Sequence, residues 1–254
     1  MSSISGISGG TDYYSAAIAS GIKLQSSADG AAEMAIAEKE RSIVNGYDQG
    51  TENSKDAQNL LNVADSAMSN IADNLNRMRE LAVQASNSAV LSNDDLKLIQ
   101  DEVDQLKQGI SDIASNTQFN SKNLLDGSYQ DEHIASNPDA SGKDISIGAM
   151  TLQALGIEDF DVTGDFSIDT IDNALSKVSE SRSNVGAQSN ALDYAISYST
   201  NSSINLSSAL SRTEDTDIAE AASELQKAKL LQNYQLLMQK KKQENEQNKF
   251  GALF

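Results

Sequence analysis

The side chains that could carry out acid–base, nucleophilic or metal chemistry are few or scattered in this sequence. His133 is the only histidine and there is no cysteine, which excludes disulfides, thiolate zinc sites and two-histidine zinc sites. No glycine-rich phosphate-binding loop of the GxxxxGK[ST] type is present. The 37 Asp and Glu residues are spread along the chain, as expected for solvated helix faces. We therefore expect no catalytic residue, no metal and no cofactor, and we do not expect an enzyme.

The net charge of the chain limits the kinds of molecule that it can bind. A formal net charge of −18 argues against duplex nucleic acid and anionic membranes, because binding to phosphates needs a basic surface. No run approaches the ~18 consecutive apolar residues of a membrane span, so membrane insertion is not expected either. The segment from Leu225 onward is the exception, with six Lys and two Glu. It is either a solvated helix end or a docking segment for an acidic partner.

Long amphipathic helices must position whatever surface the chain uses. Three apolar stripes alternate spacings of three and four residues, which is the pattern of helices that pack against other helices. The first stripe consists of Ala57, Leu61, Ala64, Met68, Ile71, Leu75, Met78, Ala82 and Ala85. The second consists of Leu96, Ile99, Val103, Leu106, Ile110 and Ile113. The third consists of Ile171, Leu175, Val178, Arg182, Val185, Ser189, Leu192, Ile196, Ser199, Ser203, Leu206 and Leu210.

The segments between and beyond the stripes complete the predicted organisation. Residues 1–30 are rich in Ser and Gly and form an arm that we expect to be disordered in the monomer. Residues 31–215 form a rod-shaped helical core domain, with a possible bend at Gly46 and Gly50 and β-hairpins at about 128–165. Residues 216–254 form a C-terminal helix that is apolar on more than one face. The predicted fold is mainly α, an elongated antiparallel bundle or coiled coil of long helices with a small β-hairpin region and paired termini.

Several segments resemble bacterial flagellin in family order. They are SGIKLQSSADGAAEMAIAEKERS (Ser20–Ser42), RMRELAVQASN (Arg77–Asn87), TQFNSKNLLDG (Thr117–Gly127), ISIGAMTLQALGI (Ile145–Ile157), SRSNVGAQSNAL (Ser181–Leu192) and NLSSALSRTEDTDIAEAASELQKAKLL (Asn205–Leu231). The resemblance implies paired termini that form the inner tube of a filament, around which the three long helices form a shell. It implies a minimal form without the variable outer domains. The short arm before Ser20 and the ends Lys240–Lys242 and Phe250–Phe254 depart from the family pattern.

Two sets of contact residues are predicted, the first from the resemblance and the second from the broad apolar surface of the last helix. The RMRELAVQ segment is expected to contact the next subunit and to be the part that the vertebrate innate flagellin receptor recognises. The residues of this predicted contact patch are Arg77, Arg79, Leu81, Gln84 and Glu102. Because Met78 and Ala82 occupy the stripe, Arg77, Leu81 and Gln84 are expected to flank it or to face outward. The predicted assembly segment contains Leu225, Leu230, Leu231, Leu236 and Leu237.

The expected function is that of a structural subunit that polymerises into the extracellular flagellar filament used for motility. The implied partners are further copies of the chain, the flagellar export machinery with its chaperone, the filament cap and hook-junction proteins, and the host receptor. Two alternatives stay open at this point. One is the flagellin-like junction protein between hook and filament, and the other is a secreted ligand of a host receptor that does not polymerise.

Overall fold

The computed structural model describes residues 2–87 and 90–251 of the chain. The protein divides into two compact units. Unit 1 contains residues 1–44 and 204–254, and unit 2 contains residues 45–203. The sequence predicted divisions at 30/31 and 215/216, so the terminal unit takes in longer parts of the chain than expected. The final residues 252–254 of the predicted C-terminal helix lie outside the described residues.

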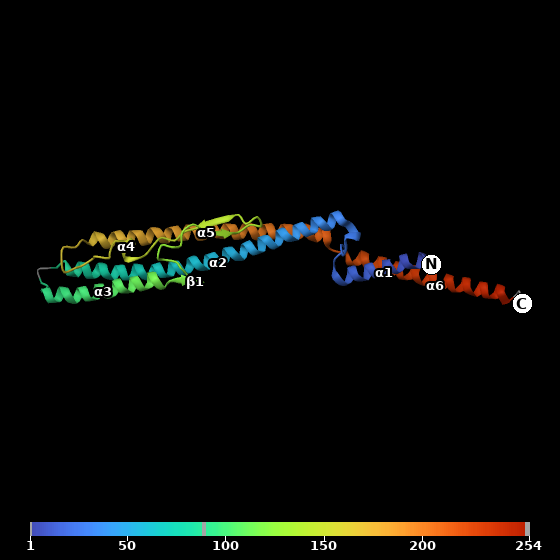
Figure 1. Cartoon of the computed structure of the whole chain (residues 1–254), viewed down its shortest axis with the longest axis horizontal. Helices are drawn as coiled ribbons and strands as arrows, with labels where there is room; N and C mark the ends of the chain where they lie inside the picture. The colour runs from blue at the N-terminus through green and yellow to red at the C-terminus, as the bar shows by residue number, and fades with distance from the viewer. Residues whose placement is uncertain (1, 88–89, 252–254) are drawn as a thin grey trace. The chain divides into compact units, whose positions relative to one another are not determined.

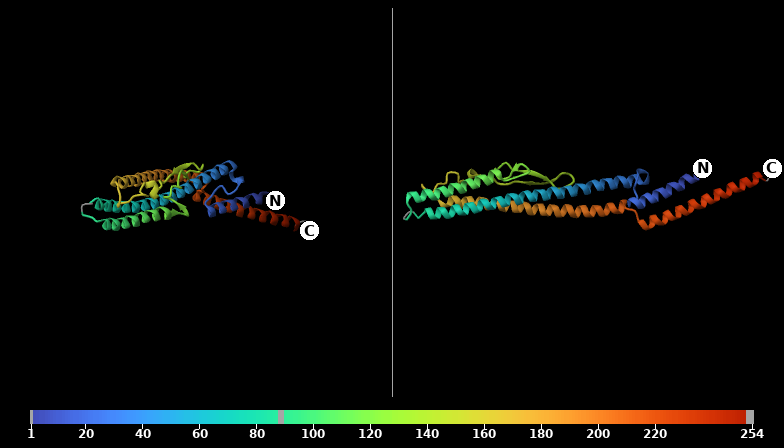
Figure 2. Two further views of the ribbon diagram at one scale, coloured as in Figure 1. Left: turned by 60° about the vertical axis from the view of Figure 1, so that its left-hand side comes forward. Right: turned by 90° about the horizontal axis from the view of Figure 1, so that it is seen from below.

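The body of unit 2 is formed by α3 (Asn93–Asn116) together with residues 45–85 of α2 (Ser27–Ala85) and residues 168–203 of α5 (Ile168–Glu214). Within the unit they lie side by side, with α2 antiparallel to both others (Figures 1 and 2). All nine residues of the first predicted stripe are buried, at 3% exposure or less. No residue of the other two stripes is exposed. These findings confirm the mainly helical fold with a small hairpin region.

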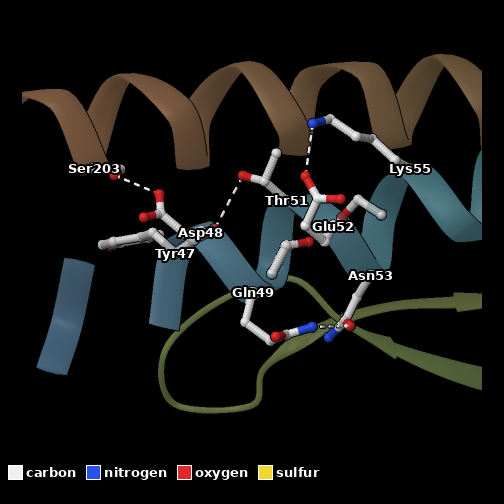
Figure 3. Close-up of polar contacts among 10 residues, drawn as sticks. Tyr47, Asp48, Gln49, Thr51, Glu52, Asn53, Lys55 and Ser203 are labelled. Carbon is white, nitrogen blue, oxygen red and sulfur yellow. Dashed lines mark hydrogen bonds and ion pairs between the residues drawn. The ribbon is translucent and has the colours of Figure 1, made fainter. Parts of the chain in front are cut away.

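Polar side chains fix the register between α2 and α5. Arg182 Nε donates to Asp65 Oδ1 at 2.8 Å, and Gln58 Nε2 donates to Asp193 Oδ1 at 2.6 Å. Farther along, the Ser203 hydroxyl donates to Asp48 Oδ1 at 2.6 Å (Figure 3). Arg182 and Ser203 of the third stripe therefore act as specific cross-helix contacts, a role that polar seam positions commonly take in coiled coils.

A small hairpin packs on the same two helices. Strands β3 (Glu132–Ala135) and β4 (Gly142–Ile145) pair antiparallel, with Glu132 opposite Ile145. The turn that follows β3 lies so close to α2 that a Cβ on Gly50 would sit 2.2 Å from the Ser136 carbonyl oxygen. A Cβ on Gly46 would similarly meet Pro138 at 2.7 Å. The predicted bend at these glycines is wrong, since α2 continues through both, and they instead make room for the hairpin.

The other short elements line the end of α3 and the connection to α5. Ser92 caps α3 in a capping box, since its hydroxyl accepts from the Asp95 backbone N–H while the Asp95 carboxylate accepts from the Ser92 N–H. Strands β1 (Gln118–Phe119) and β2 (Lys122–Asn123) form a second tiny hairpin, which lies before the predicted hairpin region. Helix α4 (Leu152–Leu155) follows. The connecting segment adds buried residues to the core, namely Leu124, Leu125, Tyr129, Ile147, Met150, Ile157, Phe160 and Val162.

Unit 1 pairs the two ends of the chain. Helix α1 (Ser2–Ser20) packs along α6 (Ile218–Gly251), and the segments beside them form an isolated antiparallel bridge between Ile22 and Asp215. Lys23 N–H donates to the Glu214 carbonyl at 2.8 Å, and the Glu214 carboxylate pairs with Arg41. The sequence predicted a disordered arm in the monomer, whereas the structure has helix at these residues. The partner helix α6 explains the difference, because Ala17 is 1% exposed in this unit.

Candidate assembly surfaces

Arg77 of the predicted contact patch lies between α2 and α3. Its guanidinium pairs with Glu102 of α3 at 2.7 Å and with Glu80 one turn along α2 at 2.9 Å. The hydrogen bonds to these two carboxylates raise the pKa of Arg77 above its ordinary value. All three side chains stay exposed to solvent. The structure thus brings Arg77 and Glu102 together, as an oriented polar surface across two helices.

Arg79 points to the other side of α2. Its Nε atom donates to Asp172 Oδ1 of α5 at 2.6 Å. Two residues along an α-helix differ by about 200° in direction, so Arg77 and Arg79 contact different neighbouring helices. The predicted patch is therefore not one continuous set of side chains.

Leu81 corrects the prediction most clearly. The side chain is 2% exposed and belongs to the core of unit 2, so Leu81 flanks the stripe inside the core, and the expectation that it is an accessible contact residue is wrong. The physical reason is that α3 returns alongside α2 and covers the face one turn beyond Arg77. Gln84, one turn farther, is exposed. Among the predicted residues, Arg77, Gln84 and Glu102 are thus accessible on this side.

The structure exposes apolar residues that the sequence analysis missed. Leu98 of α3 is 68% exposed, and Tyr194 and Tyr198 of α5 are 78% and 59% exposed. A signal for them exists, because each lies off the three- and four-residue spacing of its stripe. Tyr198 also contacts Tyr47 edge-on, with ring centroids 6.1 Å apart. Such large apolar side chains at the surface mark candidate contact positions.

Helix α6 presents two different faces. One set of buried or partly buried residues recurs every three or four positions, as expected for the face that packs on α1, and it consists of Ala221, Leu225, Ala228, Gln232 and Gln235. The residues of the opposite face, which we call the outer face, are Leu230, Leu231, Tyr234, Leu237 and Met238, each at least 52% exposed. Leu236 is 52% exposed as well. Of the predicted assembly segment, only Leu225 turns toward α1, and the other four leucines are open to solvent.

Groups that could do chemistry are not gathered into a site. In the part of the chain that the structure describes, no three His, Cys, Asp or Glu side chains are grouped so that they could hold a metal ion. His133 lies on β3, where Nδ1 is 2.6 Å from Asp144 Oδ1 and Nε2 is 3.0 Å from the Ala140 carbonyl oxygen. Over the same described residues, no helix combines the length and the apolar character that crossing a bilayer requires.

The long helices pack along apolar stripes with polar cross-helix contacts, and α6 leaves a large apolar face exposed. These features are typical of structural coiled-coil proteins. Comparison with known proteins specifies the family. The bacterial flagellin N-terminal helical region matches residues 1–130, and the bacterial flagellin C-terminal helical region matches residues 168–249. The chain therefore belongs to the bacterial flagellin family.

Two individual relatives, from Halalkalibacterium and Treponema, agree with this assignment. A flagellin of Halalkalibacterium halodurans is 36% identical over 222 residues, which is 84% of this chain and 81% of the relative. A flagellar filament 33 kDa core protein of Treponema phagedenis is 32% identical over 236 residues, covering 84% of this chain and 82% of the relative. A crystal structure of Bacillus cereus flagellin is 29% identical and covers 58% of this chain and 88% of its own, with a TM-score of 0.49.

Proposed function

We propose that this chain assembles into the flagellar filament by burying the outer face of α6 against other copies of itself. As a flagellin, the chain is a structural subunit of the extracellular flagellar filament. The relatives are flagellins and filament core proteins, which favours this function over the hook–filament junction protein and the non-polymerising ligand. The family implies self-polymerisation, and the proposal concerns which surface of this chain carries it.

The single observation that carries the proposal is the orientation of α6. Apart from Leu225, the residues of α6 that face α1 are small or polar, whereas Leu230 is 72% and Leu237 is 66% exposed on the outer face. Each such side chain gains about 1.5–3 kcal/mol when it is fully buried. A helix that turns its largest apolar residues away from its partner is stabilised when a further copy covers them. When such a contact joins different surfaces of the two copies and its rotation does not close a ring, repetition of the contact generates an open helical polymer.

Removal of Leu225–Phe254 tests the proposal. We expect the truncated protein to remain a soluble helical monomer that forms no filaments under conditions in which the full chain polymerises. Negative-stain electron microscopy and sedimentation measure the outcome, and circular dichroism checks that unit 2 keeps its helices. Filaments formed by the truncated protein would contradict the proposal. A finer variant, L230S/L237S, keeps the length of the chain and is expected to show the same loss.

The accessible part of the contact patch is a second surface for assembly. The oriented pair of Arg77 and Glu102, with exposed Gln84 farther along α2, supports a contact with the next subunit and recognition by the innate flagellin receptor. The variant R77A is expected to weaken polymerisation and receptor signalling while the free energy of unfolding stays nearly unchanged, because the ion pairs are exposed. An R77A protein that polymerises and signals normally would remove this surface from the proposal.

Export through the flagellar secretion channel, an export chaperone, and contacts with the filament cap and hook-junction proteins complete the proposed set of partners. Membership in the flagellin family is the support for each of them. Co-purification of the full chain with the export chaperone, compared with the variant truncated at Leu225, tests whether the C-terminal helix carries that interaction.

A further inference from the structure

Three consecutive lysines stand on a part of α6 that α1 does not reach. Helix α1 has 19 residues and α6 has 34, so α6 is longer by roughly 22 Å at 1.5 Å per residue. Figure 2 shows α6 continuing past the beginning of α1. Every residue from 236 to 248 is exposed, including Lys240, Lys241 and Lys242, which we call the basic end. Within the described residues none of these three lysines has a carboxylate within ion-pair distance.

The helix itself does not explain the basic end. Cations stabilise the C-terminus of a helix through its dipole, but that effect is confined to about the last turn. Lys242 lies nine residues before Gly251, where α6 ends. Glu244 and Glu246 follow Lys240 and Lys242 by four residues, the order that gives the weaker helix pair. Lys227, in contrast, is matched locally by Glu224 at 2.5 Å.

The beginning of α6 has the opposite charge. Three acidic residues, which we call the acidic beginning, are Asp217 just before α6 and Glu220 and Glu224 in its first two turns, and Asp217 and Glu220 are exposed. Glu220 and Lys241 are 21 residues apart along one straight element, roughly 31 Å. Exposed charges interact over about 8 Å at physiological salt, so the two ends of one helix cannot neutralise each other.

A second copy of the chain can supply the missing contact. Each copy carries a net charge of −18, so copies repel one another unless opposite charges meet at the contact. Lys241 continues the outer face, since it follows Leu230, Tyr234 and Leu237 at the same spacing of three and four residues. Met238, Lys241 and Lys242 also line a shallow groove with Gln235, Gln239 and Asn245. The outer face therefore continues into the basic end at Lys241.

We propose that the basic end of α6 docks against the acidic beginning of α6 in a second copy of this chain, which makes assembly directional and dependent on salt. The inference rests on the proposed function, because it specifies the polar part of the same α6 surface. Joining unlike ends produces a head-to-tail contact, which is the kind that extends a filament. Opposite charges at a contact also steer the encounter and disfavour the reversed orientation.

Charge reversal of the basic end is the first arm of the test. The variant K240E/K241E/K242E lowers the net charge from −18 to −24. At low salt, we expect its critical concentration for sedimentable filaments to be about tenfold higher than that of the unchanged chain. Near 0.5 M salt, where screening is strong, we expect the two critical concentrations to differ by less than about twofold. The control K55E/K97E/K143E makes the same change in net charge on exposed positions of unit 2 and is expected to change the critical concentration less than about twofold.

A compensating reversal provides the second arm. The variant E220K/E224K leaves Asp217 in place, because its carboxylate accepts the N–H groups of Ala219 and Glu220 at the start of α6. Alone it is expected to assemble as poorly as the lysine variant. Combined with K240E/K241E/K242E in one chain, it is expected to restore assembly, since unlike charges again meet. Circular dichroism of each variant checks that helix content is kept.

Three results overturn the inference. They are normal assembly of the lysine variant at low salt, an equal loss in the unit 2 control, and no recovery in the combined variant. Binding of the unchanged chain to phosphatidylglycerol vesicles or to duplex DNA, lost in the lysine variant while filaments form normally, would assign the basic end to those partners instead. Failure of the proposed function is distinct, since the L230S/L237S variant would then assemble as well as the unchanged chain.

Discussion

At the scale of single residues, Leu81 shows how one side chain can be misassigned from its neighbours. It follows Arg77 by one turn, and a surface position for the arginine suggests a surface position for the leucine. The structure places the guanidinium at the rim of the α2–α3 contact and the leucine inside it. A long polar side chain can reach solvent from the edge of an interface whose centre is apolar.

The variant L81A is expected to lower the free energy of unfolding of unit 2 by about 2–5 kcal/mol, because it leaves a cavity in a packed core. Chemical denaturation followed by circular dichroism measures the change. Q84A, on the exposed side of the same helix, is the matched control and is expected to change stability by less than about 0.5 kcal/mol. Equal stability of the two variants would place Leu81 at the surface after all.

We expect His133 to make the hairpin sensitive to pH. Both ring nitrogens face acceptors, Asp144 and the Ala140 carbonyl, so only the doubly protonated ring can donate to both. The hydrogen bonds to Ala140 and Asp144 raise the pKa of His133 above 6.5. A raised pKa means that this stabilisation is fully present below the unfolded value and is lost as the pH rises through the folded value.

We expect amide exchange in β3 and β4 to accelerate as the pH passes this raised value, beyond the intrinsic increase of exchange with pH. The variant H133Q removes the titrating group and is expected to show the intrinsic increase alone. Nuclear magnetic resonance titration of the His133 ring reports the pKa directly. A His133 ring that titrates below 6.5, or the same pH dependence of exchange in H133Q and in the unchanged chain, would exclude this role of His133.

At the scale of elements, the length and the buried faces of the long helices follow from the sequence. The uninterrupted stripe from Ala57 to Ala85 has only one way to bury its apolar residues, and the structure buries all nine. The hairpin at β3 and β4 was also predictable, from alternation beside Gly and Pro. The close approaches of distant segments were not. Gly50 is read locally as a weak helix residue, and only the position of Ser136 shows that its missing side chain is what the packing requires.

The candidate surfaces, too, are only partly predictable from the sequence. That the leucines of α6 are apolar on several faces is visible in the sequence, but which of them face α1 depends on the partner helix. Leu225 turns inward and Leu230 outward because α1 contacts the face of Ala221 and Ala228. The hairpin of β1 and β2 was missed, since two-residue strands carry no periodicity.

Substitution at Gly50 tests this interpretation of the hairpin. In G50A the new Cβ would overlap the Ser136 carbonyl oxygen, which also accepts the Ser199 hydroxyl at 3.0 Å. We expect a loss of roughly 1–3 kcal/mol in unfolding free energy, as for other overpacked sites. G186A is the control, because a Cβ there meets nothing within 4 Å and alanine is favoured over glycine in a helix by about 1 kcal/mol. Thermal denaturation that ranks G50A at or above the unchanged chain would contradict the close approach.

At the scale of the whole molecule, the two units differ in how much core each possesses. All residues of the main apolar core lie between Ala57 and Leu192, within unit 2. The buried apolar residues described in unit 1 are Ala17, Leu24, Ala37, Val44 and Ala221. Four of these side chains are Ala or Val, which bury little area, and stability scales with the apolar area removed from water. Unit 1 therefore has far less apolar core of its own than unit 2, and we expect contacts with other copies to add to its stability.

This difference predicts that, in an isolated subunit, local unfolding of unit 1 costs much less free energy than unfolding of unit 2. In hydrogen exchange on the dilute monomer, amides of α1 and α6 are expected to exchange at least about 100-fold faster than those between Ala57 and Ala85, because local opening costs less where few apolar contacts are broken. Polymerisation should slow exchange in α6 and leave unit 2 almost unchanged, since coupled ordering is confined to the surface that becomes covered. The variant L230S/L237S, held under the same conditions, should keep the fast exchange of the monomer. Slow exchange of α1 and α6 in the dilute monomer, with one cooperative transition for the whole chain, would mean that the subunit completes its own fold and that assembly adds no order.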